Sequence, residues 1–150
     1  MTNRTGADFE IALEKYLTAR GVDARRLRQH GKYDHGDLQV VDADGDAWTI
    51  EAKKRNHDPR PGEIDAWAEE ARTEADHAGT PFWCVVVKRH GKTDPGLAWL
   101  YLPVRTLLDC LDRAPTGAPR GDLLVSMTVN DWLPLIGAQE PADRLRKDAA

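Results

Sequence analysis

The chain contains two short apolar runs on either side of the turn Asp-Ala-Asp-Gly-Asp, and this pattern constrains its fold more than any other feature. The runs are L-Q-V-V at 38–41 and A-W-T-I-E-A-K-K at 47–54. An Asp-Gly pair between two such runs is the strongest short signal for a β-hairpin. The turn differs from a calcium-binding loop, because its glycine stands at the wrong offset and no glutamate closes it. We therefore expect two antiparallel strands joined by a structural turn.

The hairpin brings two carboxylates and a lysine together. Side chains two residues apart share one face of a strand, so Glu51 and Lys53 project together with Thr49. With the turn centred on the Asp-Gly pair, Asp37 falls opposite Glu51 or one register step away, and neighbouring strands lie about 4.8 Å apart. Carboxylates this close repel each other unless a positive charge lies between them. A divalent cation supplies that charge; the alternative is a cross-strand salt bridge of Lys53 with either acid.

Magnesium suits this arrangement, because it takes few carboxylate oxygens and leaves the rest of its octahedron to water and substrate phosphate. Asp37 and Glu51 are the expected ligands, and the backbone carbonyl of Ala52 can supply another oxygen. The ammonium of Lys53 can hold the attacking water or stabilise negative charge on the phosphorane. Glu10 flanks the apolar face of the first expected helix, where it can complete or orient the metal shell.

The rest of the chain predicts a mixed α/β domain. Apolar residues recur at helical spacing over 6–19 and 62–78, whereas 82–88 is a continuous apolar run typical of a strand buried on both faces. Further elements are expected as strands at 24–29, 97–102 and 123–129 and as short helical segments at 104–111 and 130–136. The expected fold class is α/β, a mixed central sheet flanked by helices in the order α-β-β-β-α-β.

Composition is that of a soluble globular domain. Of the 150 residues, 41% are hydrophobic and 31% charged, and no apolar run approaches the roughly 20 residues of a membrane helix. The N-terminus has no apolar signal region, so we expect a cytoplasmic protein without membrane contact. Cys84 and Cys110 lie in apolar runs and are expected to be buried free thiols, not a disulfide or a zinc site. We expect one domain over 1–138 and a polar, flexible tail over 139–150.

The net charge of −4 argues against nucleic-acid binding, but the distribution of charge argues for it. Basic residues gather at 20–32, 53–60 and 88–92, and acidic residues gather at 42–46 and 63–76. A protein that is acidic as a whole can still present one positive surface to phosphates. The alternative is that these runs are solvated loops. The residues predicted to contact DNA are Arg25, Arg26, Arg28, Lys32, Lys54, Arg55 and His57.

Several segments carry a resemblance to a known family. They are G-A-D-F-E at 6–10, L-T-A-R-G at 17–21, G-D-L-Q-V at 36–40, I-E-A-K-K at 50–54 and P-F-W-C-V-V-V-K at 81–88. With these segments the chain resembles the PD-(D/E)XK nuclease superfamily, and in detail the Holliday junction resolvases of archaeal and phage type. The resemblance extends from residue 4 to about residue 102. Gly36 stands where the superfamily pattern has proline.

The resemblance implies a restriction-endonuclease-like core and a Mg²⁺-dependent endodeoxyribonuclease in which Mn²⁺ can substitute. It implies Glu10, Asp37, Glu51 and Lys53 as catalytic residues, with the three acids and the carbonyl of Ala52 at the metal. It further implies branched DNA as substrate, cut by a homodimer, since a twofold axis relates two sites as a four-way junction requires. Two alternatives stay open: a repair or restriction nuclease acting on other DNA, and a catalytically silent DNA-binding module with the same fold.

Overall fold

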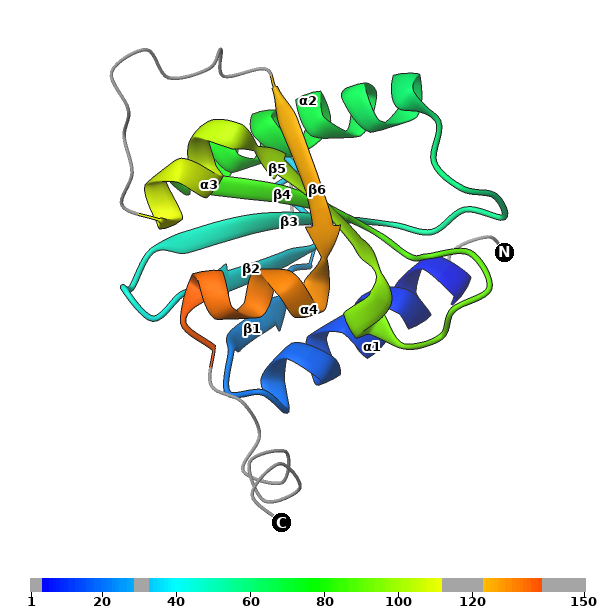
Figure 1. Cartoon of the computed structure of the whole chain (residues 1–150), viewed down its shortest axis with the longest axis horizontal. Helices are drawn as coiled ribbons and strands as arrows, with labels where there is room; N and C mark the ends of the chain where they lie inside the picture. The colour runs from blue at the N-terminus through cyan, green and yellow to red at the C-terminus, as the bar shows by residue number, and fades with distance from the viewer. Residues whose placement is uncertain (1–3, 29–32, 112–122, 139–150) are drawn as a thin grey trace.

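The structure, a computed structural model, describes residues 4–28, 33–111 and 123–138. Figure 1 shows helices on both sides of one twisted sheet. The elements are α1 (Arg4–Thr18), β1 (Asp23–Arg26), β2 (Leu38–Val41), β3 (Ala47–Lys53), α2 (Pro61–Ala78), β4 (Phe82–Val87), the 3₁₀-helix η1 (Pro95–Leu97), β5 (Trp99–Pro103), α3 (Val104–Cys110), β6 (Leu124–Thr128), α4 (Val129–Trp132) and the 3₁₀-helix η2 (Leu133–Ile136). The predicted α/β class and α-β-β-β-α-β order are confirmed. The predicted tail over 139–150 lies outside the described residues.

The six strands form one mixed sheet in the order β1-β2-β3-β4-β5-β6. Neighbouring strands are antiparallel except β3 and β4, which run parallel and are joined through α2. A parallel pair needs a crossover connection, because a tight hairpin can join only antiparallel strands. The crossover lays α2 against β3 and β4 on one face of the sheet.

Each face of the sheet has its own apolar core, and β4 contributes to both. Cys84 and Val86 belong to the core that includes α1 and α4, whereas Val85 and Val87 pack against α2. This explains the continuous apolar run of β4, since a strand covered on both faces has no solvated side. The core on the α1 side includes Phe9, Leu13, Leu17, Leu38, Trp48, Ile50 and Trp132.

The two cysteines are free, as predicted, with Cys84 fully buried and Cys110 half-buried. Burial raises the pKa of both thiols, which keeps them protonated at neutral pH. Within the described residues, no helix combines the length and the apolar character needed to cross a bilayer.

The turn between β2 and β3 is held by its own first aspartate. Oδ1 of Asp42 accepts hydrogen bonds from the backbone N–H groups of Asp44 (3.0 Å) and Asp46 (2.9 Å). Oδ2 of Asp42 accepts from the indole N–H of Trp48 (3.0 Å), and Gly45 supplies the left-handed residue of the turn at φ +86°. The Asp42 carboxylate thus stabilises backbone and indole, and it fixes where β3 begins.

Gly36 leads the chain toward β2 in a conformation that excludes other residues. Its φ is +94°, and a Cβ here would lie 2.7 Å from Cγ2 of Thr49 and 3.3 Å from the carbonyl oxygen of Ile50. Proline cannot take this place, because its ring fixes φ near about −65°. The local backbone therefore favours glycine at this position.

We expect Gly36→Ala to lower the free energy of unfolding by about 2 to 4 kcal/mol, since a left-handed backbone and overpacking both oppose the methyl group. Gly45→Ala is the matched control, because Gly45 also has positive φ but nothing lies within 4 Å of an added Cβ. The control should lose only about 1 to 2 kcal/mol. Urea unfolding followed by circular dichroism measures both, and equal losses would contradict the crowding at Gly36.

Candidate active site

Glu51 and Lys53 project from the end of β3 toward α2. Trp48 and Ile50 face the other core, as the alternation of the strand predicts. The ammonium of Lys53 lies 2.8 Å from Oε1 of Glu51 and 3.0 Å from Oε2 of Glu70. Burial acts to lower the pKa of Lys53, but hydrogen bonds and charge from the two carboxylates outweigh it and raise the pKa above its ordinary value. Lys53 is therefore a protonated cation held between two acids.

Asp37 immediately precedes β2 and lies across the hairpin from Glu51. The register pairs Leu38 with Ile50, and one further step places Asp37 opposite Glu51. The backbone N–H of Asp37 donates to the carbonyl of Ile50 (3.0 Å), and Oδ2 of Asp37 accepts from the N–H of Ala52 (2.8 Å). These bonds fix both backbone and carboxylate of Asp37 against β3.

Burial and neighbouring negative charge both disfavour the ionised form of Asp37. Its pKa is raised from the ordinary 3.8 to about 7, first by burial and then by the negative charge of Glu51, with a smaller contribution from Glu10. The hydrogen bond from Ala52 and the charge of Lys53 act in the opposite direction and do not compensate. A cation between the two carboxylates would remove this cost.

Glu10 reaches the site through its charge on Asp37, and its carboxylate is bound by an arginine. Oε2 of Glu10 lies 3.2 Å from Nη2 of Arg26 in β1. The backbone N–H of Arg26 also donates to the carboxylate of Glu14, one turn further along α1. Arg26, which the sequence predicts as a DNA contact, thus joins β1 to α1, and its side chain is 35% exposed.

Helix α2 brings two glutamates to the site that were not among the predicted residues, Glu70 and Glu74. One carboxyl oxygen from each of them and one from Glu51 lie within 4.8 Å of one another. In the described part of the chain, this is the one cluster of three side chains that could hold a metal ion. Glu51 and Glu74 are only 5% and 3% exposed. Burial, a hydrogen bond with Glu51 and nearby negative charge raise the pKa of Glu74 to about 10.

The sequence does carry a signal for Glu74. It follows Trp67 by seven positions and Ala71 by three, so it lies on the apolar face of α2, where both of those residues are buried. Charged residues are almost never fully buried unless they are paired. A glutamate inside an apolar helical stripe is therefore a site signal of its own.

The basic residues at and after β1 are on the surface. Arg25 and Arg28 are exposed, and Nη2 of Arg25 donates to Oε1 of Gln39 (2.8 Å). His35, two residues before Asp37, is also exposed. Lys32 lies outside the described residues. The surface near β1 therefore offers two arginines to a ligand.

The basic residues after β3 lie along the loop to α2. The guanidinium of Arg55 lies 5.0 Å from the ring centroid of Trp67 and 3.9 Å from Oε2 of Glu63. Nδ1 of His57 lies 3.8 Å from the other oxygen of Glu63 and 2.8 Å from the carbonyl of the next residue. Lys54 continues directly from Lys53. Arg55 and His57 thus share one acid, and Lys54 extends the positive charge beyond the strand.

The chain is thus an α/β protein in which Asp37, Glu51 and Lys53 lie at the open end of the β2–β3 hairpin, away from its turn. No protein-family model matches the chain, and no curated protein matches it. Among solved structures it is similar to Hjc, a Holliday junction resolvase from the archaeal hyperthermophile Archaeoglobus fulgidus, at 16% identity and a TM-score of 0.47 over 95% of this chain and 96% of that one. It is also similar to a VRR_NUC domain, at 24% identity and a TM-score of 0.34 over 55% of this chain and 82% of that one. Both likenesses are distant and concern the fold alone.

The raised pKa of Asp37 has a consequence for stability. A carboxyl whose folded-state pKa lies above its unfolded value stabilises the fold while it keeps its proton, and that contribution is lost as pH rises through about 7. Asp37→Asn keeps an acceptor for the N–H of Ala52 and has no proton to lose. We expect the variant to gain stability over the wild type between pH 5 and pH 8, on the order of 1 to 3 kcal/mol.

Urea unfolding in excess chelator at pH 5 and pH 8 measures this difference. Glu69→Gln is the control, because Glu69 is a surface acid of α2 with a side chain 64% exposed. A difference between wild type and Asp37→Asn that is the same at both pH values would contradict the raised pKa.

Proposed function

We propose that the chain is a metal-dependent DNA endonuclease that hydrolyses phosphodiester bonds. One observation carries the proposal: Asp37 and Glu51 lie opposite each other across the hairpin, and the Lys53 ammonium lies 2.8 Å from Glu51. The pKa of Asp37, raised to about 7 by burial and by Glu51, supports it. Two carboxylates packed together without enough positive charge form a donor set that suits a hard divalent cation.

Asp37 and Glu51 would hold Mg²⁺, for which Mn²⁺ can substitute, with the carbonyl of Ala52 and the carboxylate of Glu10 as further oxygens. When bound, such an ion polarises phosphate as a Lewis acid and lowers the pKa of a bound water. The N–H of Ala52 keeps the Asp37 carboxylate in place through its 2.8 Å hydrogen bond. Lys53, kept protonated by its carboxylate partners, would stabilise the negative charge that develops on the phosphate.

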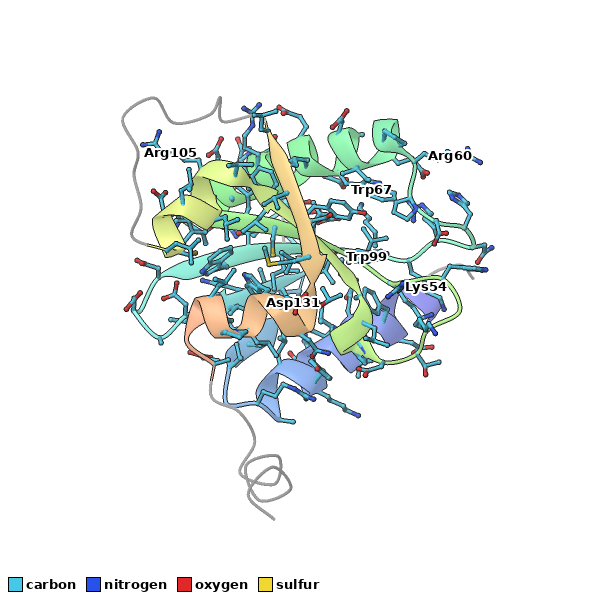
Figure 2. The ribbon with its side chains drawn as sticks, in the orientation of Figure 1. Lys54, Arg60, Trp67, Trp99, Arg105 and Asp131 are labelled. Carbon is cyan, nitrogen blue, oxygen red and sulfur yellow. The ribbon has the colours of Figure 1, made fainter. Side chains whose placement is uncertain are left out.

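The surface charge near Lys53 supports a nucleic-acid substrate. Figure 2 shows Lys54 and Arg60 on the right-hand side of its view, at the loop from β3 to α2, and Arg105 at the opposite end of the molecule. Lys54, Arg55 and Arg60 follow the strand that carries Lys53, so a DNA backbone bound to these three residues would pass close to Lys53. Arg25, Arg28, Lys32 and His57 complete the proposed DNA-binding set, and Arg26 would act chiefly in positioning Glu10.

We further propose branched DNA, in particular a four-way junction, as the substrate of a homodimer. A twofold dimer carries two identical sites, which matches a junction cut at two symmetric positions. The outer edge of β6 supports the proposal of a dimer, because within the described residues this edge pairs with no further strand. An open strand edge is a surface on which another chain can add.

Asp37→Asn and Glu51→Gln should each lower DNA cleavage by more than about 100-fold. The reason is that loss of a residue that only hydrogen-bonds to a metal ligand already lowers activity by about 10- to 100-fold. Excess chelator should stop cleavage, and Mg²⁺ or Mn²⁺ should restore it, whereas Ca²⁺ should not, because its looser coordination places phosphate and water badly. Cleavage of a labelled four-way junction, alongside nicking of supercoiled plasmid, measures all of this. Glu69→Gln should cleave like the wild type, and cleavage that persists in chelator would contradict the metal.

The choice of substrate has its own test. We expect a four-way junction to be cut far better than a flap or a linear duplex, in paired symmetric nicks, by a species with twice the mass of one chain. Light scattering gives the mass, and junctions labelled on one strand at a time give the cut positions. A monomer that cuts all three substrates equally would leave a nuclease of repair or restriction type. Binding without cleavage of any substrate would indicate a catalytically silent module.

A further inference from the structure

We propose that Glu51, Glu70 and Glu74 form a second divalent-cation site, next to the Asp37–Glu51 pair and joined to it by Glu51. The inference goes beyond the proposed function, because it concerns the binding of a cation and holds with or without DNA cleavage. The site would take a hard cation that prefers oxygen ligands, such as Mn²⁺, Mg²⁺ or Ca²⁺.

The spacing of the three carboxylates fits one ion. Their ligand oxygens lie within 4.8 Å of one another. Oxygens on opposite sides of a calcium ion are about 4.6 to 5.2 Å apart, and those around magnesium about 4.0 to 4.2 Å apart. The group can therefore close around a cation through small side-chain movements.

An unsatisfied oxygen on one of the three side chains is a second observation, separate from the spacing. Oε2 of Glu74 is buried and has no hydrogen-bond partner among the described residues, although Glu74 as a whole is only 3% exposed. A buried polar atom without a partner costs about 1 to 3 kcal/mol or more, so such atoms are rare in folded proteins. A Cβ at Gly36 would lie 3.4 Å from this oxygen, so a side chain at that position would pack directly against it.

Lys53 does not fill this position. Its ammonium contacts Oε1 of Glu51 and Oε2 of Glu70, and these are the ion pairs of Lys53 within the described part of the chain. Glu51 and Glu70 therefore share one ammonium, and Glu74, whose raised pKa keeps it protonated at neutral pH, would release its proton to bind a cation. A divalent cation bound to all three would also draw Glu70 away from Lys53, which would leave that ammonium freer to meet a phosphate.

The site has a path to solvent that suits a cation and not DNA. An open hollow of about 290 Å³ adjoins Glu70 and Glu74. Its remaining lining residues are Asp34, Glu69, Thr73 and His77. Acidic walls attract cations and repel phosphates. A cation can therefore enter through this hollow, while DNA approaches over the basic loop between β3 and α2.

Mn²⁺ titration of the DNA-free protein, with free Mn²⁺ followed by electron paramagnetic resonance, tests the proposal. We expect two ions per wild-type chain. Glu74→Gln keeps the size of the side chain but removes the group that becomes a carboxylate when a cation binds, and should weaken one ion by about tenfold or more. Glu70→Gln should weaken the same ion, and it covers the possibility that the buried substitution disturbs folding, since the Glu70 side chain is 46% exposed.

Two further variants separate this site from the first. Asp37→Asn should weaken only the other ion, and Glu69→Gln, an acid of the same helix and the same hollow, should retain both. Binding that neither Glu70→Gln nor Glu74→Gln changes would overturn the second site. A single ion lost in both Asp37→Asn and Glu74→Gln would overturn it as well, because it would show one composite site. Either result leaves the nuclease proposal to its own test, which measures cleavage in chelator.

Discussion

The register between β2 and β3 is the constraint on which the site depends. Side chains alternate along a strand, so a slip by one residue would turn Glu51 into the core and Trp48 out of it. Trp48 is fully buried, and its indole N–H is bound to Asp42 in the turn at 3.0 Å. The core on one face and the turn at the end therefore fix the position of the carboxylates on the other face.

Much of this could be predicted because it is local in the sequence. The Asp-Gly turn and the alternation from Trp48 to Lys53 predict two strands with Asp37 opposite Glu51 or one register step away. The structure places the two residues directly opposite each other. Helical spacing predicts α1 and α2, and a helix between two apolar strands predicts a crossover. The pattern of residue types alone thus carries the hairpin, the order of elements and the first pair of acids.

Contacts between elements distant in the sequence could not be predicted in the same way. Glu70 meets Lys53 because the crossover lays α2 over β3, and helical spacing does not say which turn of α2 lies beside which residue of β3. Arg26 contacts Glu10 because α1 packs on β1. The basic run at 20–32, which the sequence predicts as a DNA-binding surface, therefore contains one arginine that is already paired with an acid. Glu74 was the exception, since a buried acid in an apolar stripe could have been recognised.

Every strand of the sheet neighbours the next one in the chain. We therefore expect the two halves of the site to form at different stages of folding. Contacts between residues close in sequence form fast, because they close only short loops. The hydrogen bond between Ala52 and Asp37 spans 15 residues and is such a contact. Glu70 and Glu74 would join later, when the longer crossover through α2 packs on the sheet. We expect α2 to be the part of the fold that detaches first, so amide hydrogens of α2 should exchange faster than those of the hairpin. Opening of one helix would then expose the buried acids while the two strands below stay paired.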